Sequence, residues 1–327
     1  MNTNFAAIGE LVTEARNLLD SIKGGAIRTM QTQFDSLLMT LNSTFSSKLA
    51  SYQQQVSTVV KPAAQAIHDA FETKVVTYDP VDGDDNSLNG PFKTIGAAIA
   101  SVPDGGSITI KLPYGDTSQV FSLSEGGVNV GSRKITFNGG YSTMEAAGKK
   151  MAFLKPEVAH NARLNRTYYK FYLLGTTGAR IDFINCGLIA PRKFAGSNTS
   201  HSRDGSFISG PVSTSIHNYL MSGDHIVVED NGTTEPPMML FLSDARDNKK
   251  SMEEITLSYV RVETDQMSPL IDLRYNGTLR FSVYGATLKD KSNQPIKWGQ
   301  LFKGVSYGTH GYATNLISVE SITKKAV

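Results

Sequence analysis

The sequence has little cysteine, little net charge and no long apolar run, and each shortage excludes a class of protein. Its 327 residues contain one cysteine, Cys186, so no disulfide framework forms within the chain. The 32 basic residues nearly balance the 30 acidic ones without a Lys/Arg cluster, which argues against a nucleic-acid partner. No segment is apolar enough to span a bilayer, and the first residues lack a secretion signal. We therefore expect a protein made in the cytoplasm that does not insert into membranes.

Motifs of the common enzyme classes are absent as well. The chain has no GxxxxGK[ST] or HExxH motif and no pair of Cys-x-x-Cys motifs. Its six histidines form no ligand cluster, and the apolar neighbours of Cys186 indicate a small buried residue rather than a nucleophile. We therefore predict no cofactor and no metal site, and the motifs identify no catalytic residue.

A long helical pattern occupies the first part of the chain. Before Tyr78 the sequence is rich in Ala, Ser, Gln, Leu and Thr, and its first proline is Pro62. Apolar residues recur there at steps of three and four, which is typical of a coiled-coil seam. The predicted seam consists of Phe5, Ile8, Val12, Ala15, Leu19, Ile22, Phe34, Leu41, Phe45, Leu49, Tyr52, Val56 and Val59.

The partner of this seam is predicted to be another copy of the chain. A long helix with one narrow apolar stripe and no partner in its own chain must bury that stripe elsewhere. Phenylalanine at several seam positions is bulky for two strands and favours a trimer, and the four-residue steps at Leu41, Phe45 and Leu49 indicate a stutter. Gly24 and Gly25 predict a break in the stripe. A helical hairpin that turns at these glycines is the alternative.

Residues 78–112 combine turns, a short amphipathic helix and a strand. The run DGDDN at 82–86 favours turns, and Pro91 suits a first helical position. Pro103 ends the helix, and the alternation in SITIKL at 107–112 predicts a strand with one buried face. The predicted helix places Phe92, Ile95, Ile99 and Val102 on one side.

This stretch resembles the start of right-handed parallel β-helices of the pectate-lyase-like superfamily, especially those of bacteriophage tail spikes and tail fibres. In these proteins an Asp/Gly/Asn turn, a PFKTI helix start and a Gly-Gly strand follow one another, as they do here. The resemblance covers residues 78–112 and implies that Phe92, Ile95, Ile99 and Val102 cap a β-helix. It concerns architecture and says little about chemistry. An α/β segment of another fold is the alternative.

Beyond Leu112 the chain shows strand patterns and almost no helical periodicity. Apolar residues two apart mark runs at 135–137, 181–188, 255–262 and 279–283, at irregular spacings. Asn185, Asn231 and Asn276 follow or interrupt such runs, where a coil must turn a corner. A β-sandwich is the alternative, and the resemblance favours the β-helix.

We therefore predict a mainly β protein, a trimeric right-handed parallel β-helix preceded by an N-terminal α-helical coiled coil. Residues 1–75 form the segment for oligomerisation and virion attachment, with the break near Gly24 and Gly25. Residues 76–112 form the turn, the capping helix and the first strand, and residues 113–327 form the β-helix body.

Three sets of side chains are candidates for ligand chemistry. Glycan-cleaving spikes of this fold use paired carboxylates across a groove, sugars stack on exposed aromatic rings, and a polar loop at 192–215 carries His201 and Asp204. A solvated or core role is the simpler interpretation of most of them. The carboxylates are Asp182, Asp224, Glu229, Asp230, Glu253, Glu254, Glu263, Asp265 and Asp272. The aromatic residues are Tyr168, Tyr169, Tyr172, Tyr219, Tyr259, Tyr275, Tyr284, Trp298 and Tyr307.

The resemblance implies a homotrimeric tail fibre or tail spike of a phage virion. Its N-terminus would dock on a phage tail or baseplate protein, and its body would meet a host surface polysaccharide or outer-membrane receptor. A non-enzymatic receptor-binding protein is favoured because the body is short for a depolymerase and lacks a recognisable acid/base signature. A polysaccharide depolymerase, either hydrolase or lyase, and a structural connector to a separate receptor-binding protein are the alternatives.

Overall fold

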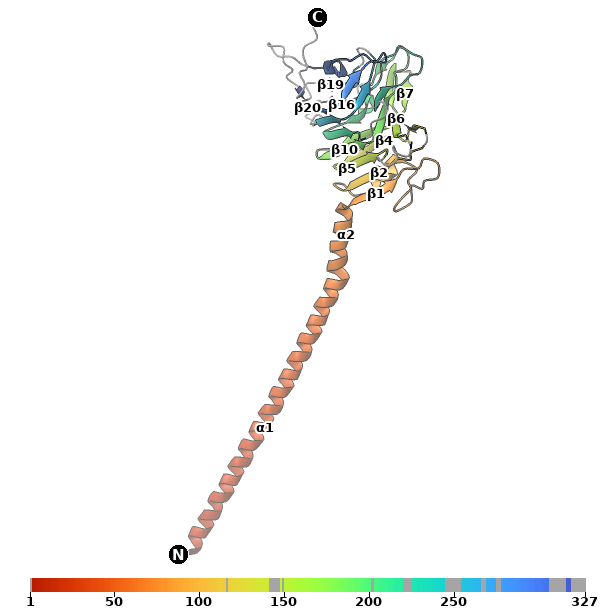
Figure 1. Cartoon of the computed structure of the whole chain (residues 1–327). Coiled ribbons are helices and arrows are strands. Elements are labelled where there is room, and N and C mark those ends of the chain that lie inside the picture. Colours follow the sequence, from red (N-terminus) through yellow and green to blue (C-terminus); the bar gives the residue numbers. More distant parts are fainter. Residues whose placement is uncertain are drawn as a thin grey trace. The chain divides into compact units, whose positions relative to one another are not determined.

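The computed structural model describes residues 2–115, 117–140, 148, 150–200, 203–219, 225–244, 254–265, 269–274, 278–305 and 316–318. The chain divides into two compact units, residues 1–69 and 70–327. The first is helical and the second is mainly β (Figure 1).

The helical unit is built from three consecutive helical segments. α1 (Asn2–Gln55) leads into a π-helical turn, η1 (Val56–Val60), and α2 (Lys61–Phe71) follows directly. The backbone N–H of Lys61 bonds to the carbonyl of Val56, which is the five-residue step of a π-helix. At 1.5 Å per residue the helical stretch is about 100 Å long.

The helix shows no break at Gly24 and Gly25, so that prediction and the hairpin alternative are wrong. α1 runs through both residues. A glycine inside a helix costs only about 1 kcal/mol relative to alanine, and good helix formers on both sides compensate for this cost. Side chains also bond to the two glycine carbonyls, from Arg28 Nε at 3.1 Å to Gly24 and from Thr29 Oγ1 at 3.0 Å to Gly25.

The strands of the body form three parallel sheets. The first sheet contains β1 (Thr73–Thr77), β2 (Ser107–Lys111), β5 (Lys134–Asn138), β10 (Ala179–Ile184), β14 (Val212–His217), β17 (Glu254–Ser258), β20 (Leu279–Tyr284) and β23 (Leu316–Ser318), in this spatial order. The second contains β3 (Gln119–Leu123), β6 (Ala152–Pro156), β11 (Cys186–Ala190), β15 (Ile226–Val228), β18 (Arg261–Glu263) and β21 (Thr287–Lys289). The third contains β4 (Gly127–Gly131), β9 (Tyr172–Gly175), β13 (Ser206–Ser209), β16 (Met239–Asp244), β19 (Ile271–Arg274) and β22 (Phe302–Lys303).

The chain passes through the three sheets one after another, and each complete turn of the chain adds one strand to each sheet. β2, β3 and β4 make one such turn, and β10, β11 and β13 make another. The strand of one turn pairs in parallel with the strand of the next, as for β10 between β5 and β14. Figure 1 shows β1, β2, β5 and β10 stacked in this order. This topology fits a parallel β-helix.

Inward-facing side chains of successive turns stack into columns, because parallel pairing keeps equivalent positions in register. In the first sheet Ile110, Phe137, Phe183, Ile216 and Leu257 form one such column, and all of them are buried. The rings of Phe137 and Phe183 stack with centroids 5.2 Å apart and an interplanar angle of 12°. The core of the body is therefore continuous from turn to turn.

Smaller elements lie in the connections between the strands of the three sheets. β7 (Val158–Asn161) and β8 (Arg166–Tyr169) form an antiparallel hairpin, and β12 (Asn198–Thr199) pairs with β8. The short helical segments within the described residues of the body are α3 (Ile95–Ala100), η2 (Arg203–Gly205) and η4 (Trp298–Leu301).

The predicted run at 181–188 is two strands that meet at a corner. β10 ends at Ile184 and β11 begins at Cys186, with Asn185 between them at φ 48°. Asparagine tolerates this left-handed conformation, and its Nδ2 donates to the carbonyl of Gly140 at 2.7 Å. Asn231 instead accepts a bond from the Thr233 hydroxyl after β15, and Asn276 lies outside the described residues.

The predicted cap is shorter than expected, although its apolar residues are buried. α3 begins at Ile95 with Thr94 as its N-cap, so Pro91 and Phe92 precede the helix. Phe92 instead forms a β-bridge with Tyr78, and the sheet already begins at β1, a strand that the sequence analysis missed. Phe92, Ile95, Ile99 and Val102 are each at most 4 % exposed.

Two features hold the turn that precedes α3. A Cβ on Gly83 would lie 2.4 Å from the carbonyl oxygen of Asp79 and 2.5 Å from the nitrogen of Lys93, so only glycine fits there. The Asp85 carboxylate accepts bonds from the Thr94 backbone N–H at 2.8 Å and from the Thr94 hydroxyl at 2.9 Å. The acidic turn therefore acts as a structural brace for the helix start.

Glu125 connects α3 to the β3–β4 connection. Its carboxylate accepts the backbone N–H groups of Ile95 and Gly96, both at 3.0 Å, and so satisfies donors that a helix start leaves free. Burial raises the pKa of Glu125 above its usual 4.5, against these two bonds, and Asp85 raises it further.

The raised pKa of Glu125 predicts a specific pH dependence of stability. The folded body binds a proton here more readily than the unfolded chain, so this contribution to the free energy of unfolding is present below pH 4.5 and is lost as the pH rises through the folded-state pKa. In Glu125→Gln this component is expected to disappear. Thermal unfolding measured across that pH range checks the expectation, with Glu157→Gln, which removes a carboxylate 2.9 Å from Lys170, as the control. Equal pH profiles for Glu125→Gln and the wild type would contradict it.

Candidate functional site

The predicted seam residues all lie on an exposed surface of the helical unit. The large apolar members are between 45 % and 75 % exposed, and Ala15 is exposed as well. Every residue of α1 from 4 to 55 is exposed except Gly24 and Gly25, which are half-buried. Leu11 and Leu18 are also exposed beside Val12 and Leu19, which makes the apolar face wider than the predicted stripe. The helix buries none of this surface by itself.

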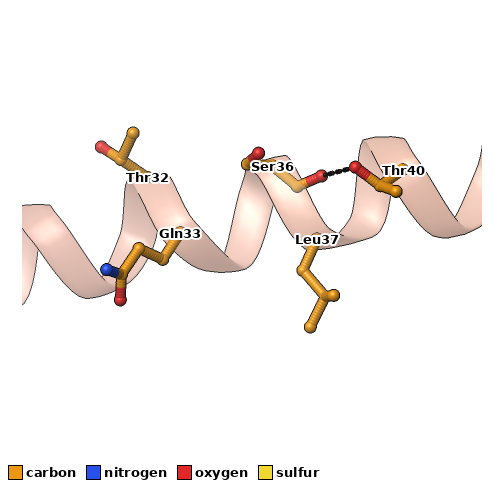
Figure 2. Close-up of a pocket in the computed structure, with 5 residues that line it drawn as sticks. All are labelled: Thr32, Gln33, Ser36, Leu37 and Thr40. Atoms are coloured by element: carbon orange, nitrogen blue, oxygen red, sulfur yellow. Dashed lines mark hydrogen bonds between the residues drawn. The ribbon is translucent and has the colours of Figure 1, made fainter.

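A shallow depression lies on α1 between successive turns (Figure 2). Thr32, Gln33, Ser36, Leu37 and Thr40 line it, and the Thr40 hydroxyl donates to the carbonyl of Ser36 at 2.8 Å. All five residues belong to one helix. The depression therefore becomes enclosed only when another element packs against it.

The segment at 192–215 is largely part of the solenoid, so its prediction as a surface loop is wrong. It contains β12, η2, β13 and the start of β14, and Ser197, Ser200 and Ser206 are buried. All four residues of β13, SFIS at 206–209, are buried, so this strand carries no two-residue alternation in the sequence. Asp204 accepts a bond from the Ser200 hydroxyl at 2.7 Å, and His201 lies outside the described residues.

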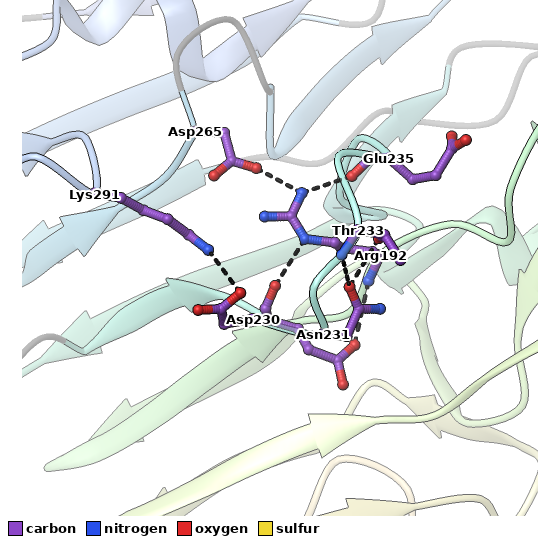
Figure 3. A network of polar contacts seen from close by, with 8 residues as sticks. Arg192, Asp230, Asn231, Thr233, Glu235, Asp265 and Lys291 are labelled. Carbon is purple, nitrogen blue, oxygen red and sulfur yellow. Dashed lines mark hydrogen bonds and ion pairs between the residues drawn. The ribbon is translucent and has the colours of Figure 1, made fainter.

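Several predicted carboxylates gather around the buried cation of Arg192 (Figure 3). Its Nη1 lies 2.6 Å from Asp265 Oδ2 and donates to the carbonyl of Glu235 at 2.6 Å, and its Nε donates to the carbonyl of Glu229 at 2.8 Å. A charge removed from water requires such partners. The network fixes the segment after β15 against the segment after β11.

The other carboxylates around Arg192 have cationic partners of their own. The Glu229 carboxylate pairs with Lys155, and Asp230 lies 3.6 Å from Lys291. This is the arrangement of a structural network, in which the carboxylates of Glu229, Asp230 and Asp265 each face a positive charge. It does not present two opposed carboxylates of the kind that glycoside cleavage uses.

The remaining predicted carboxylates are spread over the body. Asp182 pairs with Arg180 at 2.8 Å and accepts the Ser215 hydroxyl, and Glu263 lies 4.0 Å from Lys289. Glu254 stands in register with Arg280 on β20, and Asp272 is buried on β19. Asp224 and Glu253 lie outside the described residues. Of the candidate carboxylates within the described ranges, the structure thus brings together Glu229, Asp230 and Asp265.

Cys186 lies in the core at the start of β11. Its thiol is buried, and burial raises its pKa, so it is held as a neutral thiol. Among the residues that the structure describes, no three His, Cys, Asp or Glu side chains gather as they would around a metal ion.

The predicted aromatic residues separate into buried and exposed groups. Tyr169 is fully buried, Tyr168 and Tyr172 are half-buried, and Trp298 packs on Phe281 with centroids 5.8 Å apart. Tyr275 and Tyr307 lie outside the described residues. Tyr219, Tyr259 and Tyr284 are the exposed members, at 64 %, 50 % and 64 %.

These three tyrosines lie along one corner of the body, where the chain leaves the first sheet. Tyr284 ends β20, Tyr259 follows β17, and Tyr219 comes two residues after the end of β14. The rings of Tyr259 and Tyr284 meet edge to face at 5.1 Å, and the ring of Tyr219 is parallel to His217 at 6.5 Å. The Tyr219 backbone N–H donates to Asn185 Oδ1 at 2.7 Å, which anchors it to the preceding turn. We call these four residues, His217, Tyr219, Tyr259 and Tyr284, the tyrosine corner.

Tyr259 adopts a backbone conformation that bulky residues avoid. Its φ is 56°, at the corner position where Gly285 on the next turn has 59° and Asn185, two turns earlier, has 48°. A Cβ on Gly285 would lie 2.7 Å from the ring of Tyr259, so the absence of a side chain there makes room for the ring. The hydrogen bond to the Tyr284 hydroxyl raises the pKa of Tyr259. Sequence reasoning listed these tyrosines without placing them together, because the register that aligns them depends on the stacking of distant turns.

No family model, no curated protein and no solved structure matches the chain. None of the helices in the described part of the chain combines the length and the apolar character needed to cross a membrane.

Proposed function

We propose that the chain is a tail-fibre or tail-spike subunit of a phage virion, and that three copies associate through the N-terminal helix to present a β-helical body to the host surface. The observation that carries the proposal is the pairing of a long helix whose apolar residues are all exposed with a body of stacked parallel turns. The resemblance of residues 78–112 to phage β-helical proteins supports the same conclusion.

The helical unit supports association between copies on energetic grounds. Isolated helices are marginally stable in water and gain most of their stability from packing an apolar face. Here the apolar residues recur from Phe5 to Val59 and stay exposed. Burying each of the large ones would contribute about 1.5–3 kcal/mol. A parallel coiled coil of identical chains buries the seam residues at once.

The width of the apolar face favours three strands over two. Leu11 and Leu18 extend the stripe of Val12 and Leu19 to one side. A narrow two-position seam suits a dimer, whereas a broader face suits helices that contact two neighbours. The phenylalanines of the seam add bulk that a trimer accommodates more readily.

The body supports a role in surface recognition by its rigidity and its repetition. Stacked turns with continuous interior columns hold exposed side chains in fixed positions, and three copies add avidity to weak contacts. The N-terminus would dock on a tail or baseplate protein, and the body would contact a host polysaccharide or an outer-membrane receptor.

The molar mass of the full chain in solution tests the proposal. Light scattering of the full chain is expected to give three times the mass of one chain, and a truncated chain that begins at Lys74 is expected to give a lower multiple. Virions labelled with antibodies against the body should carry the label on the tail. A full chain that remains monomeric at micromolar concentration would overturn the proposal.

A further inference from the structure

The tyrosine corner exposes aromatic rings on a backbone that the stacked strands hold in place. Three rings that are at least half exposed stand on consecutive turns, about 4.8 Å apart from turn to turn. Tyrosine exposes apolar ring area together with a hydroxyl, which suits ligands that have an apolar face and a polar edge. The cluster therefore has the composition of a contact surface.

The strain at Tyr259 points to a role in binding rather than in folding. A residue held in the left-handed region costs about 1–3 kcal/mol, and such residues concentrate where strain serves function. The same corner position accepts Asn185 and Gly285 on other turns, so the fold itself does not require an aromatic residue there. Since half of the Tyr259 side chain remains exposed, core packing does not account for it either.

The side chains around the rings indicate the chemistry of the ligand. His217, Ser258 and Tyr284 stand in register on β14, β17 and β20, and the next outward row carries Thr256 and Ser282. This surface offers hydroxyls and one imidazole. The charged groups around it include the pair Arg180 and Asp182, in register with Ser213 and Ser215 of β14, and the in-register pair Glu254 and Arg280, each of opposite sign. Arg261, two residues after Tyr259, is exposed as well. A hydroxyl-rich surface beside aromatic faces is complementary to a saccharide, whose ring has an apolar C–H face and a rim of hydroxyls.

We propose that the tyrosine corner binds a saccharide unit, with the exposed ring of Tyr259 or Tyr284 stacked on the sugar and the neighbouring hydroxyls bonded to its rim. The inference deepens the proposed function, since it names the receptor class and the surface that meets it. It predicts that Tyr259 contributes to binding while costing stability.

The experiment compares two variants of Tyr259 in the full chain. Tyr259→Asn places at the corner a residue that tolerates φ 56°, and Tyr259→Ala removes the ring without that benefit. The probes are the methyl glycosides of glucose, galactose, mannose, rhamnose and N-acetylglucosamine, followed by saturation-transfer NMR, with methyl glucuronide as the charged comparison. Tyr114→Ala, which removes a tyrosine that is 47 % exposed between β2 and β3, is the matched control.

The wild type is expected to bind at least one glycoside, and Tyr259→Asn is expected to bind it about tenfold more weakly while unfolding at the same or a higher temperature. Tyr284→Ala should weaken binding similarly, and Tyr114→Ala should leave it unchanged. Absence of glycoside binding by the wild type, or equal loss in Tyr114→Ala, would each overturn the assignment. A changed molar mass in the Tyr259 variants would identify the corner as a contact between copies instead. A monomeric full chain that still binds the glycoside would overturn the trimer and leave this site standing.

Discussion

Replacing Phe183 by alanine is expected to lower the free energy of unfolding of the body by about 3–5 kcal/mol, because it opens a cavity in the centre of the core. Phe183 is fully buried on β10, stacked on Phe137 of the preceding turn and 6.3 Å from the ring of Phe207. Each turn of a solenoid is stabilised mainly by its neighbours, so the loss weakens two interfaces at once. Urea unfolding followed by near-ultraviolet circular dichroism measures the change.

Phe194→Ala is the matched control for this experiment. Phe194 is 44 % exposed and its ring contacts His160 at 5.6 Å outside the core. Its removal is expected to cost less than about 1 kcal/mol, since an exposed ring contact contributes little. If both variants unfold at the same urea concentration, the interior columns do not dominate the stability of the body.

The sequence predicted the local elements of this fold better than their assembly. Two-residue alternation at 135–137 and 279–283 placed β5 and β20, because each strand has one buried face. The predicted run at 255–262 covers two strands instead, β17 and the start of β18, which meet at the corner of Tyr259. The helical stripe likewise placed α1. The predicted break at Gly24 and Gly25 failed because the cost of a glycine is local, whereas helix propagation depends on all neighbours.

Other features depended on contacts that no sequence window contains. β1 is short and mostly exposed, and it is a strand because β2 pairs with it. The start of α3 is set by Thr94 and by Glu125 from a later part of the chain, so the helix start predicted from Pro91 was wrong. The gathering of Tyr219, Tyr259 and Tyr284 follows from the register of β14, β17 and β20, which only the stacked turns define.

The carboxylates show why residue type alone did not identify a site. Nine were candidates from the sequence, and the structure groups Glu229, Asp230 and Asp265 around Arg192, Lys155 and Lys291. Each charge is balanced by a neighbour of the opposite sign. Only the cations, which were not considered with them, reveal that the group is a structural network.

Leu41→Glu is expected to dissociate the full-length protein into monomers at micromolar concentration. Leu41 is 61 % exposed on α1 and belongs to the predicted seam. In a trimer the change removes three buried leucines, worth about 5–9 kcal/mol in total, and places three carboxylates at one level of the seam. Because glutamate is a good helix former, the helix itself should persist. Light scattering reports the mass, and circular dichroism reports the helix.

Met39→Glu separates the seam from the rest of the helix surface. Met39 is 74 % exposed, two residues from Leu41, and lies outside the predicted seam. Successive helical residues are 100° apart, so Met39 and Leu41 point in nearly opposite directions. Met39→Glu is therefore expected to keep the trimer mass. Dissociation by both variants would show that association does not follow this stripe, and a trimer that tolerates Leu41→Glu would mean that the copies are held together elsewhere in the chain.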